Sequence, residues 1–501
     1  EGGEFEITGH VAVVTEVFPD RIRLIEQNVE DTVWPDGCTY SREIHATVSA
    51  DGGYWIECSY ENAQILGWVI QTEDATHAEL IVDTDPLLFN MQLRELPNTG
   101  LHRETWLNLA NADEAAYVEM MGGCLLPRTE DDQYRYFCLS EAAYGEIKRA
   151  TNEMHALFMH ATNFVLQHDE LLRTFNIPEA LWPRIHQSWD NRRNQMITGR
   201  FDFSLSERGL KVFEYNCDSA SCHMECGKIQ QIWAEHFECE DGHGTGHDLH
   251  ADLVDAWRKS GITGVLHIMQ DGDPEESYHA QYMKTAIERD GLGWDDSGNV
   301  VDEDGERVEQ VWKTWAWETA LDEIRDQIDD DAENLRLHRV IDRKTVSPRL
   351  VDVLLRPEVM VYEPLWTLIP SNKAILPVLS MMFPKNRYVL NTQTTLTDDL
   401  KKTGYVSKPI VGRSGANISI YDRNSELVGE TAGRFDDRDQ IYQELFPLPV
   451  LDGRSAQICT FTVDGAFSGG TVRADTSPII TTDSDIFPLR ILTNRDMLAG
   501  K

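Results

Sequence analysis

The stretch from Lys211 to Cys222, KVFEYNCDSASC, combines the residue types of a buried β-strand with polar side chains at every other position. In a strand, Glu214, Asn216 and Asp218 would point to the same face, because successive side chains alternate. Burying such a face is costly unless it binds a cation or another polar ligand. The sequence therefore predicts a strand with one apolar face and one polar face, and the polar face predicts a ligand site.

A second segment, GRFDF, adds to the same predicted site. Asp202, Glu214 and Asn216 offer carboxylate and amide oxygens, which are the ligands that Mg²⁺ prefers. Because Mg²⁺ usually keeps water and phosphate partners, this set indicates an ion that arrives with a nucleotide. Arg200, two positions before Asp202, would share its strand face and could neutralise phosphate charge. A purely structural cluster of arginine and carboxylates is the alternative, and the residues leave both open.

The segment Val406–Ile420, VSKPIVGRSGANISI, reads as a strand, a glycine-rich turn and a second strand. Gly412 and Gly415 would let the backbone bend over a phosphate, and Lys408 and Arg413 supply positive charge. The GxxxxGK[ST] pattern of a P-loop is absent. A plain hairpin with two glycines is the alternative.

Three further segments each carry charged residues that could bind a ligand or could have a purely structural role. Lys373 in PSNKAILP precedes an apolar run, and such a lysine is more often a surface residue than a ligand. Glu275 and Glu276 follow Pro274 in a pattern typical of a helix start, and the same carboxylates could bind an ammonium group. Arg473 in FSGGTVRAD could bind a carboxylate through two hydrogen bonds or form a structural ion pair.

Composition narrows the classes of ligand. The net charge of −40 at pH 7 indicates a solvated acidic surface that would also attract cations. Nucleic acid is disfavoured as a partner, because no Lys/Arg stripe offsets this charge. No apolar run is long enough to cross a membrane. Nine cysteines without a CxxC motif favour a reducing, cytoplasmic location.

The pattern of elements changes along the chain of 501 residues. Residues 1–80 consist of short alternating segments and predict a small, mostly β domain; 81–104 reads as a linker, and 105–501 as a larger domain. In that domain apolar strands alternate with helical stretches, which predicts an α/β (α+β) fold. The spacing of apolar residues from Ile147 to Val165 predicts a long helix, with Ser140 as its N-cap.

A histidine and a carboxylate stand out in the first segment. His10 and Glu26 fall on neighbouring predicted strands, and a histidine oriented by a carboxylate is the base of Cys–His hydrolases. No nucleophile precedes His10 in this sequence. Cys38 and Cys58 follow it in ordinary strand settings.

Several long motifs carry a resemblance to one family. They are GRFDF, FEYNCDSASCHMECG, QDGDPEESYHAQYM, VWKTWAWETA, VYEPLWTLIPSNKAILP, KKTGYVSKPIVGR and VDGAFSGGTVRAD, in this order. With them the chain resembles the glutathionylspermidine synthetase/amidase family and the related trypanothione synthetases over essentially its whole length.

The resemblance implies two domains. Residues 1–80 would be the C-terminal half of a papain-like CHAP (NlpC/P60-type) cysteine amidase, with His10 and Glu26 as catalytic residues. The sequence starts within this domain, and we expect the nucleophilic cysteine to precede it. Residues 105–501 would be an ATP-grasp-like synthetase.

The resemblance also implies roles for individual residues in the synthetase. Mg²⁺ would be held by Asp202, Glu214 and Asn216, and the transferring phosphoryl group would lie beside Arg200. ATP would be bound by Lys373, Lys408 and a lid that contains Gly412, Arg413 and Gly415. Glutathione would contact Ser219, Ser221, Cys222 and Arg473. The polyamine would meet Glu275, Glu276 and Asp485.

The function implied is ATP-dependent ligation of the glycine carboxylate of glutathione to an amine of spermidine through an acyl phosphate. A trypanothione synthetase, which adds a second glutathione, is one alternative. A cysteine amidase alone and a non-catalytic polyamine or thiol binder are alternatives of other classes. The last is disfavoured, because every expected synthetase position carries a suitable residue. The oligomeric state is open.

Overall fold

The computed structural model describes residues 12–18, 21–25, 39–48, 54–56, 85–100, 104–191, 197–262, 265–270, 274–283, 293–294, 300–301, 305–337 and 349–499. Two residues predicted to be catalytic, His10 and Glu26, lie outside this part of the chain, and so does the side chain of Glu275.

The first described segments form an antiparallel four-stranded sheet with its own small apolar core. Its strands, in spatial order, are β1 (Val13–Val17), β2 (Arg21–Ile25), β3 (Arg42–Val48) and β4 (Tyr54–Ile56). Ile22, Leu24 and Ile44 are buried together there. The predicted β content of residues 1–80 is confirmed for these strands.

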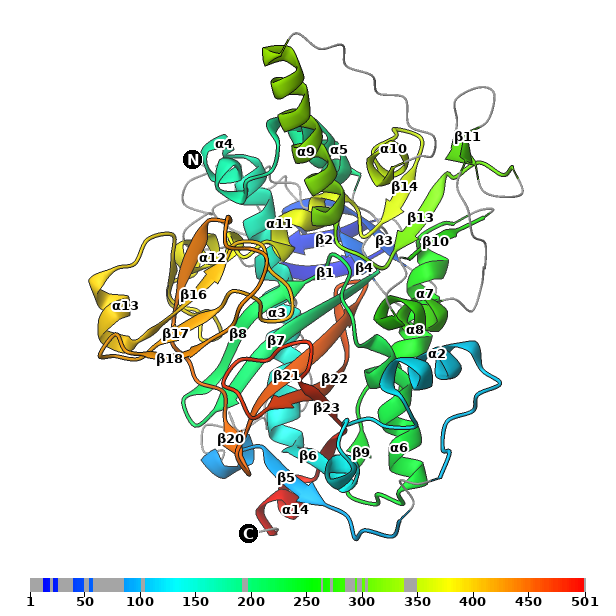
Figure 1. Ribbon diagram of the computed structural model, residues 1–501, viewed down its shortest axis with the longest axis vertical. Helices are drawn as coiled ribbons and strands as arrows, with labels where there is room; N and C mark the ends of the chain where they lie inside the picture. Colours follow the sequence, from blue (N-terminus) through cyan, green and yellow to red (C-terminus); the bar gives the residue numbers. More distant parts are fainter. Residues whose placement is uncertain are drawn as a thin grey trace.

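A six-stranded antiparallel sheet forms the centre of the larger body (Figure 1). Its order is β23 (Asp485–Phe487), β22 (Ala466–Asp475), β21 (Arg454–Val463), β7 (Thr198–Ser206) and β8 (Gly209–Asn216), and β20 (Val450–Leu451) also pairs with β21. Strands distant in sequence are therefore neighbours, since β7 hydrogen-bonds to β21.

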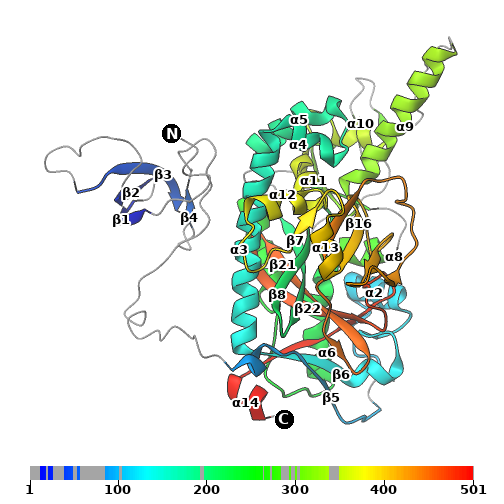
Figure 2. The ribbon, with the colours of Figure 1, turned by 90° about the vertical axis from the view of Figure 1, so that its left-hand side faces the viewer.

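The long helix α3 (Glu141–Leu166) covers the apolar face of this sheet and runs along it in Figure 2. Ser140 caps it as predicted, because its Oγ accepts a hydrogen bond from the N–H of Ala143 at 3.0 Å. Phe158 of the helix packs edge-on against Phe201 and Tyr215 of the sheet. The two sheet residues are fully buried cross-strand partners whose rings stack with centroids 3.8 Å apart.

Three smaller sheets surround this core. A five-stranded antiparallel sheet has the order β15 (Thr392–Gln393), β19 (Gln440–Glu444), β16 (Tyr405–Pro409), β17 (Ser419–Tyr421) and β18 (Leu427–Glu430). A parallel sheet joins β10 (His267–Met269), β13 (Gln310–Lys313) and β14 (Met360–Tyr362). The third contains β5 (Gln92–Glu95), β6 (Arg135–Ser140), β24 (Leu489–Leu492) and β9 (His243–Gly244). Strands β11 (Gly293–Trp294) and β12 (Val300–Val301) form a separate pair.

The remaining α-helices lie around these sheets. They are α2 (Ala112–Met121), α4 (Asp169–Leu172), α5 (Trp182–Asp190), α6 (Gln230–His236), α7 (Leu249–Lys259), α8 (Pro274–Met283), α9 (Trp317–Arg336), α10 (Leu350–Leu354), α11 (Leu368–Ser371), α12 (Ile375–Met382), α13 (Asp398–Thr403) and α14 (Asn494–Ala499). The described residues thus form a mixed fold of helices and sheets. Among them no helix has both the length and the apolar character required to cross a membrane.

The structure can be compared with two of the predictions, the hairpin in 406–420 and the linker in 81–104. The predicted hairpin in 406–420 is confirmed, because β16 and β17 pair antiparallel on either side of the glycine-rich turn. The segment 81–104, predicted as a linker, contains β5, which pairs with β6. Part of that segment is therefore strand, and its backbone groups are satisfied by pairing with β6.

Candidate active site

Two adjoining cavities lie over the polar face of the central sheet. The first, of about 320 Å³, is lined by Lys373 and Lys408 and is called the lysine cavity. The second, of about 310 Å³, is lined by Glu276 and Glu318 and is called the glutamate cavity. The residues that line both are Arg200, Glu214, Ser221, Gly412, Ser414 and Thr482. This common set forms a wall at which ligands of the two cavities would meet.

Strand register explains why the polar residues meet. Arg200 pairs with Asn216, and Asp202 with Glu214, across β7 and β8. All four side chains line one or both cavities, so the polar face predicted from alternation is confirmed for them. Asp218 differs from the prediction. Strand β8 ends at Asn216, so Asp218 lies beyond the strand, where its carboxylate pairs with Lys313. Asp218 nevertheless lines the glutamate cavity together with Glu214 and Asn216.

Ion pairs hold the two carboxylates on this face. The guanidinium of Arg200 donates to Asp202 at 2.9 Å, and the Nζ of Lys373 lies 2.9 Å from Glu214. Burial alone would raise the pKa of Glu214, but the charges of Lys373 and Lys408, together with Arg200, outweigh it and lower the pKa to about 2. Glu214 is therefore ionised at neutral pH.

Lys408 completes the positive side of the lysine cavity. Its Nζ donates to Gln443 at 2.7 Å and lies 5.1 Å from the ring centroid of Phe213. Burial lowers the pKa of Lys408 to about 8, because Glu214 only partly offsets the cost of desolvating the charge. An anionic ligand placed here would recover that cost.

The glycine-rich turn after β16 lies against both cavities. The carbonyl of Gly412 accepts a hydrogen bond from the Nζ of Lys373 at 3.0 Å. Gly415 has φ of +70°, and a Cβ at this position would lie 2.2 Å from the carbonyl oxygen of Ile480. Only glycine fits there. Arg413 lines the glutamate cavity, so all five predicted lysine and turn positions line one or both cavities.

The turn that follows β8 forms another wall, and we call residues 217–222 the DSAS turn. Arg200 donates from Nη1 to Ser221 Oγ at 3.1 Å and to its carbonyl at 3.4 Å. Ser219 and Cys222 have φ of 66° and 72°, a region that non-glycine residues rarely adopt. Ser219 and Ser221 line the glutamate cavity, and Cys222 lines the lysine cavity.

Only some of the residues predicted to contact the polyamine and glutathione line a cavity. Glu276 lines the glutamate cavity and accepts a hydrogen bond from the Oγ1 of Thr314. Arg473 lines the lysine cavity, where its Nη2 donates to the carbonyl of Thr481 at 2.5 Å. Asp485 lines neither cavity. Its Oδ1 accepts from the N–H of Arg128 at 2.8 Å, and burial raises its pKa.

Comparison with known proteins places this site in a family. The family described as "Glutathionylspermidine synthase preATP-grasp" matches residues 102–492. The chain belongs to this family. The resemblance drawn from the motifs is therefore confirmed.

Individual relatives agree with this assignment. The chain is 43% identical over 503 residues to the bifunctional glutathionylspermidine synthetase/amidase of Escherichia coli (strain K12), an alignment that covers 98% of this chain and 80% of that protein. It is 36% identical over 528 residues to the trypanothione synthetase of Crithidia fasciculata, with 97% and 78% covered. The glutathionylspermidine synthase of the same organism is 28% identical over 580 residues, with 97% and 77% covered.

Sequence reasoning missed several residues that the fold brings to the site. Glu318, in the first turn of α9, lines the glutamate cavity, and burial raises its pKa despite the nearby Arg325. Lys313 and Thr314 contact the DSAS turn. The signal was present in VWKTWAWETA, because a lysine within an apolar strand must find a buried partner.

Proposed function

We propose that this protein is an ATP-dependent acid–amine ligase that joins the glycine carboxylate of glutathione to an amine of spermidine. Membership of the family supports this assignment, and so do the printed names of the relatives. The structural observation that carries it is the pair of adjoining cavities with opposite charge. One is lined by lysines, the other by glutamates, and Arg200 and Glu214 line both.

ATP is assigned to the lysine cavity. Phe213, Ile420 and Phe446 give it apolar walls that suit a purine base, and Lys373 and Lys408 suit the phosphates. The turn with Gly412 and Gly415 would lie over the phosphate groups as a lid.

The donor set on the strand face fits Mg²⁺. Asp202, Glu214 and Asn216 supply two carboxylates and one amide, an incomplete set that suits an ion with phosphate and water ligands. These three residues would hold the ion, and bound Mg²⁺ supplies charge neutralisation for the phosphates.

Spermidine is assigned to the glutamate cavity, and glutathione to the shared wall together with the adjoining side of the lysine cavity, which Cys222 and Arg473 line. Ser219, Ser221, Cys222 and Arg473 would contact glutathione. Glu275 and Glu276 would bind the polyamine by charge. The ammonium groups of spermidine carry the charge that these carboxylates complement. The role of Asp485 at the polyamine stays a prediction from the resemblance, because its side chain lines neither cavity.

The chemistry would then run in two steps. A carboxylate oxygen of glutathione attacks the γ-phosphorus of ATP, a new P–O bond forms, and the bond to ADP breaks. Arg200, on the shared wall, offsets the charge of the transferring phosphoryl group. An amine of spermidine then attacks the carbonyl carbon of the acyl phosphate. The C–N bond forms, phosphate leaves, and one proton is released.

Mass spectrometry of products after incubation with Mg²⁺–ATP, glutathione and spermidine tests the proposal, with phosphate release followed in parallel. A mono-conjugate with one phosphate per amide is the expected result. Further conversion to the bis-conjugate would assign a trypanothione synthetase. Folded protein that yields neither conjugate nor phosphate would refute the ligase and leave a binder or a hydrolase.

A second activity, hydrolysis of the same amide, is favoured by one observation. The similarity to a synthetase/amidase covers 98% of this chain and so includes the sheet β1–β4. We assign this region to a CHAP-type amidase domain, with His10 as base and Glu26 as the residue that orients it. Incubation of purified glutathionylspermidine with a protein that includes the expected nucleophilic cysteine tests this. Cleavage that a His10→Ala variant lacks supports the assignment, and cleavage unchanged by that variant contradicts it.

A further inference from the structure

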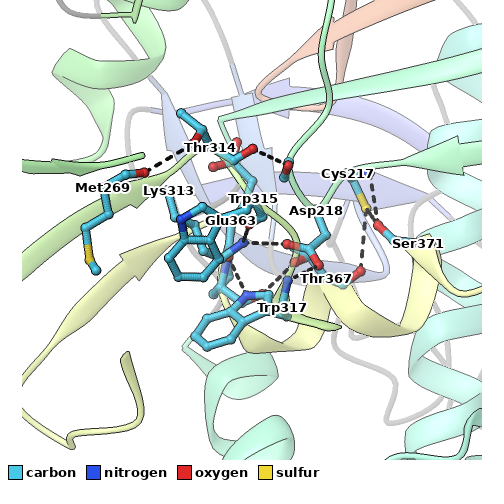
Figure 3. Close-up of polar contacts among 12 residues, drawn as sticks. Cys217, Asp218, Met269, Lys313, Thr314, Trp315, Trp317, Glu363, Thr367 and Ser371 are labelled. Atoms are coloured by element: carbon cyan, nitrogen blue, oxygen red, sulfur yellow. Dashed lines mark hydrogen bonds and ion pairs between the residues drawn. The ribbon is translucent and has the colours of Figure 1, made fainter. Parts of the chain in front are cut away.

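Lys313, at the end of β13, is a fully buried lysine that pairs with Asp218, a residue that lines the glutamate cavity (Figure 3). Its Nζ lies 2.5 Å from Asp218 Oδ1 and donates to the carbonyl of Trp315 at 3.1 Å. It also lies 5.8 Å and 5.0 Å from the ring centroids of Trp315 and Trp317. The charge is thus held by one carboxylate, one carbonyl and two aromatic faces.

The partner carboxylate belongs to the DSAS turn. The second oxygen of Asp218 accepts from the backbone N–H of Trp317 at 2.7 Å, so both of its oxygens are used. The preceding residue, Cys217, is bound through its N–H to Ser371 Oγ at 3.1 Å. The left-handed residues Ser219 and Cys222 cost free energy that the surrounding contacts must offset. Asp218 is the charged contact that anchors this turn.

Thr314, the residue after β13, contacts two residues that line the glutamate cavity. Figure 3 shows its further contact with the carbonyl of Met269, 3.4 Å from its hydroxyl. The carbonyl of Thr314 accepts a hydrogen bond from the hydroxyl of Ser219. Its own hydroxyl donates to the carboxylate of Glu276. Thr314 therefore contacts the proposed glutathione wall through its backbone and the proposed polyamine carboxylate through its side chain.

A contribution to the stability of the fold does not by itself account for this buried ion pair. A buried ion pair is often no more stabilising than well-packed apolar side chains of the same volume, because both charges lose their hydration. What the pair does provide is one defined geometry for the turn. In a reaction between two bound substrates, a small misplacement of either one lowers the rate strongly.

We propose that Lys313 and Thr314 are positioning residues that set the DSAS turn and Glu276 relative to each other, so that the glutathione carbonyl and the spermidine amine meet. The inference rests on the proposed function. Lys313 acts through Asp218, and Thr314 acts through Glu276 and Ser219. Neither residue touches the reacting atoms.

The first test is Thr314→Val, which removes the hydroxyl and keeps the shape and the carbonyl. We expect KM for spermidine to rise about tenfold to a hundredfold, the effect of losing one hydrogen bond to a charged group. KM for ATP is expected to stay unchanged. Phosphate released per amide should exceed one, because water would intercept an acyl phosphate whose amine is misplaced.

Two variants control this test. Thr314→Ser keeps the hydroxyl and should restore the wild-type KM for spermidine. Thr162→Val removes another buried threonine hydroxyl, one that bonds only within α3 through the carbonyl of Phe158, and should leave all kinetic parameters unchanged. If Thr314→Val behaves like Thr162→Val, the inference is wrong.

The second test removes the buried ion pair as a unit. In Lys313→Met/Asp218→Asn no charge is left without a partner, and the asparagine carbonyl can still accept from the N–H of Trp317. We expect the melting temperature to stay close to wild type while KM for glutathione rises about tenfold. The single Lys313→Met variant should melt at a lower temperature, because Asp218 is left buried and unpaired.

The outcomes separate this inference from the proposed function. Wild-type protein that forms no conjugate refutes the ligase, and calorimetric binding of spermidine to wild type and Thr314→Val still tests the role of Thr314. Conjugate formation by wild type with unchanged kinetics in both the Thr314→Val and the double variant overturns the positioning role.

Discussion

The lysine cavity and the glutamate cavity differ in what surrounds the wall that they share. The first lies against the five-stranded sheet and combines apolar walls with Lys373 and Lys408. The second lies against the DSAS turn, α8 and α9, and carries Glu276 and Glu318. The comparison teaches that a protein of net charge −40 binds an anion only where cations are clustered locally, whereas the carboxylates that attract a polycation are abundant and need only be placed in a cavity.

The largest expected effect is at the shared wall. Asp202→Ala should lower ligation about a hundredfold to a thousandfold, because one proposed ligand of the Mg²⁺–phosphate group is lost. Hydrolysis of glutathionylspermidine should be spared. Product formation by mass spectrometry measures both reactions, and the exposed Asp398→Ala is the matched control. Ligation that survives Asp202→Ala would show that the metal assignment is wrong.

The next effect tests the lysine cavity alone. Lys373→Met should raise KM for ATP about tenfold to a hundredfold, because a buried cation at the proposed phosphate site is removed. KM for spermidine should not change. Initial rates at varied ATP and varied spermidine measure the two values, with the exposed Lys402→Met as control. An equal rise in both KM values would break the distinction between the cavities.

A variant in the glutamate cavity should change KM for spermidine and not KM for ATP. Glu276→Gln should raise KM for spermidine about tenfold, because a carboxylate–ammonium interaction becomes a neutral hydrogen bond. KM for ATP should stay unchanged. Glu333→Gln, on the exposed part of α9, provides the same change of charge away from the site. A larger effect on ATP than on spermidine would reverse the assignment of the two cavities.

The smallest effect on activity is expected at Glu363, which lines neither cavity. Burial raises the pKa of Glu363 from 4.5 to about 7, although the backbone N–H and hydroxyl of Thr198 and the charge of Lys313 oppose the shift. The folded state therefore binds this proton more tightly than the unfolded state. Its contribution to stability, on the order of 3 kcal/mol, is complete below about pH 4.5 and is lost as the pH rises to about 7.

Thermal unfolding at several pH values checks this prediction. Glu363→Gln keeps an oxygen that can accept from Thr198 and cannot ionise, so its melting temperature should fall less than that of wild type between pH 5 and 8. Parallel pH profiles of the two proteins would show that Glu363 does not titrate in this range. Ligation kinetics should differ little between them, because the residue contacts neither proposed ligand.

Local features of the fold could be predicted from the sequence because they depend on neighbouring residues. The two faces of β8, the N-cap Ser140 and the hairpin around Gly415 follow from alternation, capping and backbone freedom. Site residues could be predicted only where they lie on such a strand or turn, or where the family resemblance supplied them. Asp485 shows the limit of that route, because a matching position did not place its side chain in a described cavity.

By itself, the sequence determined which strand face is polar, where the glycine turn must bend, and which family the chain joins. Only the tertiary structure decided which distant groups meet. Lys313 pairs with Asp218 across 95 residues, and Glu318 reaches the glutamate cavity from the start of α9. The physical reason is that periodicity acts between adjacent residues, whereas a buried charge finds its partner only when separate elements pack together.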